Sequence, residues 1–378
     1  MHVKRSVLAA VAAAGALTVS LVPALTASAD TTAKPDARKP RPPLLTVAEG
    51  LDNPRGLAFA PDGSLYVAEA GRGGRGPCQT GPEGDKVCFG RSGAITKIRY
   101  GRSTRVISNL PSLAAPDGSQ AGGPADVGTD RRGTLSWVVG LGGDPALRDK
   151  QPALRGMAQL YERGRRGPQA VADLGAYERR VNPDGVKPAD TNPNGLAVAR
   201  DGRYVVDAGG NSLLRVDQRG KIRTVAVFPQ RFVKAPAGVP GVPAGKIVPM
   251  QSVPTAAVRG PDGAWYVSEL TGFPFPAGQA RVYRVEPGQK PRVYATGLTN
   301  VIDLAWGPGG LYALEISHKG LLSGDDTGAL VRVNRHGTTV VASEGLHAPG
   351  GVAIRGRDAY VTNHGTSPRT GTVVKIRL

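Results

Sequence analysis

A strand-turn-strand pattern recurs six times in this 378-residue chain, and no other feature limits the fold as much. Asp-Gly or Gly-Gly between alternating apolar residues predicts a tight hairpin in most copies. Third strands are expected to begin near Gly93, Gly156, Ser212, Ala280, Gly328 and Gly371. The clearest copies are GLAFAPDGSLYVAE (56–69), GLAVARDGRYVVD (195–207), AAVRGPDGAWYVSE (256–269), DLAWGPGGLYALE (303–315) and GVAIRGRDAYVTN (351–363), with a weaker one at 126–140. The sequence therefore predicts an all-β fold, a six-bladed β-propeller with four-stranded blades.

The two ends of the repeat array indicate how the ring closes. Five repeats continue into a fourth strand, whereas the sixth stops at Leu378 after its third. The missing strand is expected near the N-terminus, because LLTVAEGLDNP (44–54) closely matches TVVASEGLHAP (339–349). We therefore expect an N-terminal strand to complete the last blade, which would leave no open sheet edge.

The segment before the repeats has the features of an export signal. A basic start is followed by an apolar stretch from Val7 to Val22 and by the small residues Ala27-Ser28-Ala29. We predict a signal peptide over residues 1–29, a disordered leader rich in proline and basic residues over 30–43, and the propeller over 44–378. The mature protein is then expected to be secreted after cleavage near Ala29, with no membrane span.

Cys78 and Cys88 are the only cysteines in the chain. In an oxidising compartment an even pair so close in sequence predicts a disulfide, which would stabilise its glycine- and proline-rich loop by about 3 kcal/mol in the chain-entropy model. A catalytic thiol is the less favoured interpretation.

The strand order predicts one elaborated face of the ring. The connections from second to third strand and from fourth to first strand carry the long insertions, so we expect this top face to bind a ligand. Antiparallel pairing is expected to set each first-strand start opposite a second-strand end, for example Asp303 opposite Glu315. Several polar groups would then converge at the channel mouth, and the ligand-binding candidates are Glu69, Asp207, Glu269 and Asn363.

Asp303 and Glu315 are also the main candidates for catalysis, since two close carboxylates share a proton or hold a cation. His318 and His364 follow the second strands of adjacent blades and could meet above the channel as acid–base groups. The alternative is a hydrated polar channel whose acids cap backbone amides and pair with arginines. No HExxH, GxSxG or nucleotide-binding glycine motif occurs.

The charge balance narrows the class of partner. The chain has 48 basic and 30 acidic residues, a formal net charge of +18. Many arginines are predicted in the bottom turns, where they could tether the protein to an anionic cell-envelope component or could simply solubilise the turns. We expect a monomer that binds a small molecule or an envelope component, and no nucleic acid, because the chain is exported.

Four strings make the chain resemble the ScyD/ScyE family of secreted propellers: GPCQTGPEGDKVCFGRSGAITKI (76–98), VVGLGGDP (138–145), NPNGLAVARDGRYVVDAGGNSLLRVD (192–217) and SELTGFPFPAGQARVYRV (268–285). The resemblance covers residues 44–378 and implies an exported propeller, without a reaction. More distantly, the repeat is similar to NHL-type and lactonase-type propellers and to streptogramin lyase. Lactonases bind calcium through residues just before the first-strand glycine, and only Asn194 matches that pattern, whereas the Glu-x-His arrangement of the lyase is absent.

Two classes of function remain open. The first is a ligand- or partner-binding protein that uses the top face. The alternative is a metal-assisted hydrolase or lyase at the mouth of the central channel, with a calcium or other divalent ion held by Asn194, Asp303 and Glu315.

Overall fold

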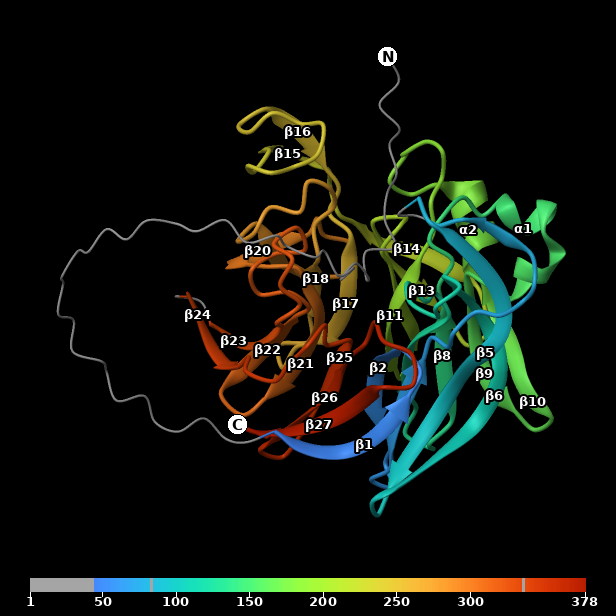
Figure 1. The fold of residues 1–378 in the computed structure, drawn as a ribbon. Helices are drawn as coiled ribbons and strands as arrows, with labels where there is room; N and C mark the ends of the chain where they lie inside the picture. The colour runs from blue at the N-terminus through green and yellow to red at the C-terminus, as the bar shows by residue number, and fades with distance from the viewer. Residues whose placement is uncertain (1–43, 82–83, 335–336) are drawn as a thin grey trace, which may run out of the picture.

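The computed structural model of this chain describes residues 44–81, 84–334 and 337–378. The predicted signal peptide and leader lie outside the described residues. Six four-stranded antiparallel blades form a β-propeller, as predicted (Figure 1). Their first strands contact one another in the cyclic order β2, β7, β11, β17, β21, β25 and back to β2. These strands therefore line the central channel.

Blades 1 to 3 contain most of the inserted structure. Blade 1 has β2 (Pro54–Phe59), β3 (Leu65–Glu69), β5 (Lys86–Arg99) and β6 (Arg102–Ala114), with the short β4 (Cys78–Thr80) paired to the start of β5. Blade 2 has β7 (Pro124–Thr129), β8 (Leu135–Val139), β9 (Gln159–Gly164) and β10 (Gly167–Asp173), interrupted by helix α1 (Leu147–Lys150) and a 3₁₀ helix (Pro152–Gly156). Helix α2 (Leu174–Val181) then leads to blade 3, which has β11 (Pro193–Ala199), β12 (Gly202–Asp207), β13 (Ser212–Val216) and β14 (Ile222–Val227).

Blades 4 to 6 follow a separate hairpin of β15 (Arg231–Lys234) and β16 (Ile247–Met250), which projects beyond the blades in Figure 1. Blade 4 has β17 (Pro254–Arg259), β18 (Trp265–Glu269), β19 (Ala280–Val285) and β20 (Arg292–Leu298). Blade 5 has β21 (Val301–Gly307), β22 (Gly310–Glu315), β23 (Ala329–Asn334) and β24 (Gly337–Ala342). The last blade has β25 (Gly351–Arg355), β26 (Asp358–Asn363) and β27 (Gly371–Arg377), and β1 (Leu45–Leu51) pairs with β27.

Period-two alternation explains why these segments form blades. In each blade one apolar row packs against the preceding blade and the other against the next, so second strands such as β3, β8 and β18 are buried along their whole length. The largest core side chains, among them Trp137 and Phe228, lie between blades rather than in the channel. The rigid blades thus carry the insertions on a well-packed frame.

The predicted register at the top of the blades was wrong by about two residues. Glu315 pairs with Val301 rather than Asp303, and Glu269 pairs with Pro254 rather than Ala256. A bulge early in the first strand inserts the extra residue, which the repeat pattern alone did not reveal. The third strand of blade 2 also begins at Gln159, later than predicted, because the preceding residues form the 3₁₀ helix.

Candidate functional site

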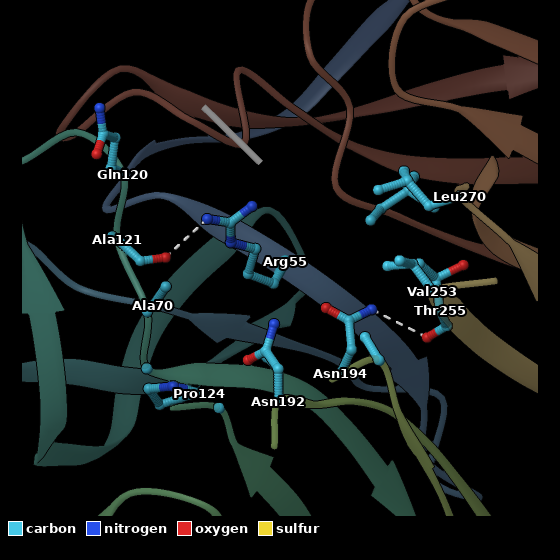
Figure 2. A pocket seen from close by; sticks show the side chains of 16 residues that line it. Arg55, Ala70, Gln120, Ala121, Pro124, Asn192, Asn194, Val253, Thr255 and Leu270 are labelled. Atoms are coloured by element: carbon cyan, nitrogen blue, oxygen red, sulfur yellow. Dashed lines mark hydrogen bonds between the residues drawn. The ribbon is translucent and has the colours of Figure 1, made fainter. Parts of the chain in front are cut away.

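A small cavity opens at the top of the central channel, where the loops of four blades meet (Figure 2). Its volume is about 50 Å³, enough for a few water molecules since one needs about 10–15 Å³. The wall combines apolar side chains with amide, hydroxyl and guanidinium groups. The principal polar lining residues are Arg55, Gln120, Asn192, Asn194 and Thr255. Among the described lining residues Arg55 is the only charged one, so the cavity is suited to a polar or anionic group.

Two hydrogen bonds between neighbouring blades fix the polar wall. Arg55 Nη2 donates to the carbonyl oxygen of Ala121 at 2.8 Å, and Asn194 Nδ2 donates to that of Thr255 at 2.9 Å (Figure 2). Both side chains come from the position just before a small first-strand residue, where the strand enters the channel. Because their orientation is set by backbone acceptors, the cavity is held in shape without a ligand.

Two carboxylates, Asp126 and Asp303, lie deeper in the channel on blades 2 and 5. Asp126 accepts the N–H groups of Val127 and Leu196, and Asp303 accepts those of Leu304 and Val352, all at 2.7 Å. Each carboxylate therefore bridges its own blade to the next one. Burial raises the pKa of Asp303 to about 7, and burial together with the charge of Asp303 raises the pKa of Asp126.

The polar ends of the second strands are buried caps, and none of them lines the cavity. Four of them accept a backbone N–H from the loop that precedes their own blade: Glu69 from Asp52, Asp207 from Asn192, Glu315 from Thr299, and Asn363 from His347. Glu269 instead accepts from Arg231 Nη2 at 2.6 Å. This repeated bond attaches each top loop to its blade, which favours the amide-capping interpretation for these residues.

Glu69 is the cap with the most extensive contact to a charged side chain. It is fully buried and accepts from Thr96 Oγ1 and from Arg105, whose Nη2 lies 2.6 Å from its Oε2. The same guanidinium reaches Asp52 Oδ2 at 2.9 Å. Such a network stabilises the blade and leaves the Glu69 oxygens engaged with protein donors.

The three described histidines gather on the top loops of blades 5 and 6. His318 Nδ1 contacts the buried carboxylate of Glu315, and His347 Nδ1 lies 3.0 Å from Asp326 Oδ1. His364 stacks on His347 with ring centroids 5.3 Å apart, and burial together with the nearby His347 lowers its pKa. His364 thus contacts His347, a pairing that sequence reasoning missed because these residues lie on different loops.

The structure places the three candidate metal ligands in separate contacts. Asn194 binds Thr255, Asp303 bridges blades 5 and 6, and Glu315 contacts His318. In the described ranges, no three His, Cys, Asp or Glu side chains are grouped as metal ligands. The structure brings Asp126 close enough to Asp303 for their charges to interact, a pair that the sequence did not connect.

A second hollow, of about 680 Å³, lies at the outer edge of the top face. It is lined by Arg72, Arg75 and Arg369 and by the loop around Asp117. Arg72 Nε lies 3.2 Å from Asp52 Oδ2. The adjoining loop is held by the disulfide between Cys78 and Cys88, which confirms that prediction. The disulfide is also consistent with an oxidising, extracellular environment.

Comparisons with known proteins support the fold alone. No family model and no curated protein sequence matches the chain. Solved structures similar to it include the PQQ-bound aldose sugar dehydrogenase from Streptomyces coelicolor, at 12% identity and TM-score 0.51 over 89% of this chain and 99% of that one. A glucose dehydrogenase is similar at 13% identity and TM-score 0.51, over 89% of this chain and 100% of that one. A streptogramin B lyase is similar at 12% identity and TM-score 0.47, over 89% of this chain and 86% of that one.

Among the described residues, no helix is long and apolar enough to cross a membrane.

Proposed function

We propose that this chain is an exported binding protein that takes a small polar ligand with an anionic group at the mouth of its central channel. The ligand's anionic end would enter the cavity beside Arg55, and the rest would extend over the top loops. This proposal retains the predicted top face but moves the contacts away from Glu69, Asp207, Glu269 and Asn363, which cap backbone amides or bind arginine.

One observation carries the proposal. The cavity places a guanidinium and two asparagine amides around a small volume, and no carboxylate lines it among the described residues. The guanidinium favours a carboxylate or phosphate over a neutral group. Of the two asparagines, Asn194 already donates its amide N–H to Thr255, so Asn192 is the amide that could add a donor. The adjacent arginine-lined hollow extends the positive charge across the top face.

The experiment is a titration of the purified chain with D-glucuronate and glycerol 3-phosphate, with glucose as the uncharged comparison. We expect binding of at least one anion and a loss of at least tenfold in affinity for Arg55→Gln, because a hydrogen bond to a charged group contributes about 1.5–3 kcal/mol. The matched control is Arg355→Gln, since Arg355 likewise donates to a backbone carbonyl of the adjoining blade, that of Gly63, but at the bottom turns. Equal affinity in Arg55→Gln and Arg355→Gln, or preference for glucose, would contradict the proposal.

A second candidate is a hydrolase or lyase, and the pairing of Glu315 with His318 favours it. The buried Glu315 carboxylate orients the imidazole through Nδ1, while the His318 side chain remains 44% exposed. A histidine oriented in this way can act as a general base toward a substrate on the top face. Turnover of a lactone such as dihydrocoumarin, lost in His318→Asn and retained in Arg55→Gln, would support catalysis over binding.

A further inference from the structure

A second group of acids, separate from the channel, surrounds the contact between helix α2 and the turn after β12. Its central member is Glu178 on α2, which is fully buried. Neither of its carboxylate oxygens has a hydrogen-bond partner among the described residues. A buried carboxylate without partners is costly, so this position calls for a proton or a cation.

Two further oxygens in the same region are buried and unpartnered: Asp190 Oδ1 and Asn182 Oδ1. Asn182 caps the C-terminus of α2 in the left-handed conformation, and its backbone N–H donates to the carbonyl oxygen of Glu178. The glycine turn brings the two carboxylates close to the blade. A Cβ on Gly209 would lie 2.8 Å from Asp190 Oδ1, and one on Gly210 would lie 2.6 Å from Glu178 Oε2. Only a Gly-Gly turn therefore leaves room for both acids.

The charges around these oxygens are all negative. Asp207 and Asp184 act on both Glu178 and Asp190, and Asp144 acts on Asp190 as well. Asp207 is already saturated, because it accepts from Thr191 Oγ1 and three backbone N–H groups. Within the described part of the chain, no arginine or lysine forms an ion pair with any of these five acids, although the protein carries a net charge of +18. The nearby Arg148 and Arg179 pair with Asp173 and Asp149 instead.

The protonation of the two central acids reflects this excess of negative charge. Burial, followed by the charges of Asp207 and Asp184, raises the pKa of Glu178 to about 8, and the same causes raise that of Asp190 to about 8. A bound cation would supply the positive charge that this group of acids lacks.

We propose that Glu178 and Asp190 bind a calcium ion between α2 and the Gly209-Gly210 turn. The unpartnered atoms are all oxygens, which calcium prefers, and no sulfur or imidazole lies among them to favour zinc or copper. In the described ranges no three acidic, cysteine or histidine side chains are grouped as metal ligands, so the protein offers this ion only two carboxylates. The Asn182 amide oxygen and water molecules complete the six to eight oxygen ligands that calcium takes.

Such an ion would act on the top face. The segment 182–192 connects α2 to blade 3, and it ends at Asn192, which lines the mouth cavity. Calcium would hold this segment against the blade and so fix the position of Asn192. The inference does not depend on the proposed ligand, because calcium binding is measured without it.

The test uses the full chain, freed of metal with EDTA and titrated with CaCl₂ at pH 8 by calorimetry, with bound calcium measured after gel filtration. We expect one calcium per chain and a rise in the thermal unfolding midpoint that grows with calcium concentration. Glu178→Gln and Asp190→Asn should each weaken binding at least tenfold. Asp190→Asn alters the loop rather than the helix core, so it remains informative if Glu178→Gln does not fold.

The matched control is Asp303→Asn, which removes a partly buried carboxylate from the channel instead. Calcium binding that survives Asp303→Asn and is lost in Asp190→Asn supports the proposed site. Binding lost in Asp303→Asn and unchanged in Asp190→Asn would place the ion in the channel and overturn the proposal. Absence of calcium binding at pH 8 would also overturn it.

Discussion

Replacement of Asp303 by asparagine should change the pH dependence of stability in a defined direction. Burial raises the pKa of Asp303 from 3.8 to about 7, so the folded state holds this proton more tightly than the unfolded state does. Stability is then lost as the pH rises from about 4 to about 7. At about 1.4 kcal/mol per pH unit, the loss reaches up to about 4 kcal/mol. Asp126 lies in the same channel, and the charge of Asp303 contributes to raising its pKa as well.

The asparagine side chain cannot ionise. It also has one acceptor oxygen, whereas the Asp303 carboxylate has two. It retains one oxygen for either Leu304 or Val352, and the other N–H faces its amide group. We therefore expect Asp303→Asn to be less stable than the wild type at pH 5 by about 1–3 kcal/mol, the cost of one unsatisfied buried donor. Between pH 5 and 8 this difference should shrink or change sign as the wild-type carboxyl ionises.

Urea denaturation at pH 5, 6, 7 and 8 in EDTA measures the free energy of unfolding for both proteins. The control is Asp217→Asn in an exposed turn. Backbone N–H groups of Lys221 and Arg219 lower the pKa of Asp217, so its difference from the wild type should stay constant over this range. A constant difference for Asp303→Asn, or one that grows with pH, would refute the reasoning.

Three further predictions test the frame around the site. Glu69→Gln should lower the free energy of unfolding by about 2 kcal/mol, because it removes the charge that Arg105 and Thr96 donate to, and a loss below about 0.5 kcal/mol in urea would contradict this assignment. Gly56→Ala should cost about 1–3 kcal/mol through overpacking, since its Cβ would lie 2.0 Å from Asp126 Oδ1, whereas Gly122→Ala, with nothing within 4 Å, should be nearly neutral by thermal unfolding. Replacing Cys78 and Cys88 together by serine should lower stability by up to about 3 kcal/mol, and an unchanged melting temperature would mean that the loop is ordered without the bond.

The blades were predictable because their signals are local. Asp-Gly turns and apolar alternation specify each hairpin within about 14 residues, and repetition specifies the ring. The register at the top was not predictable, since the repeat pattern does not show where a bulge adds a residue, and in blade 5 it falls between Val301 and Asp303.

The chemistry that sequence reasoning missed joins residues from different loops. His347 meets His364 across two loops of neighbouring blades, and Asp126 faces Asp303 from the opposite side of the ring. Glu178 and Asp190 lie in an insertion without a counterpart in the other repeats, so no alignment of the repeats could pair them. Only the fold brings these two acids to the same turn.

The innermost ring determines how a ligand can approach. The six equivalent first-strand positions carry Gly56, Asp126, Gly195, Ala256, Asp303 and Gly351, and neighbouring strands pack closely there. A Cβ on Gly195 would lie 2.4 Å from the carbonyl oxygen of Thr255, and one on Gly351 would lie 2.8 Å from Gly56 Cα. These small residues let the strands come together, and the two aspartates bond across the remaining gaps. Only about 50 Å³ is left above this level, so any ligand larger than its anionic end must lie across the top loops. Specificity should therefore depend on the insertions, including the segment that calcium is proposed to hold, rather than on the repeated strands.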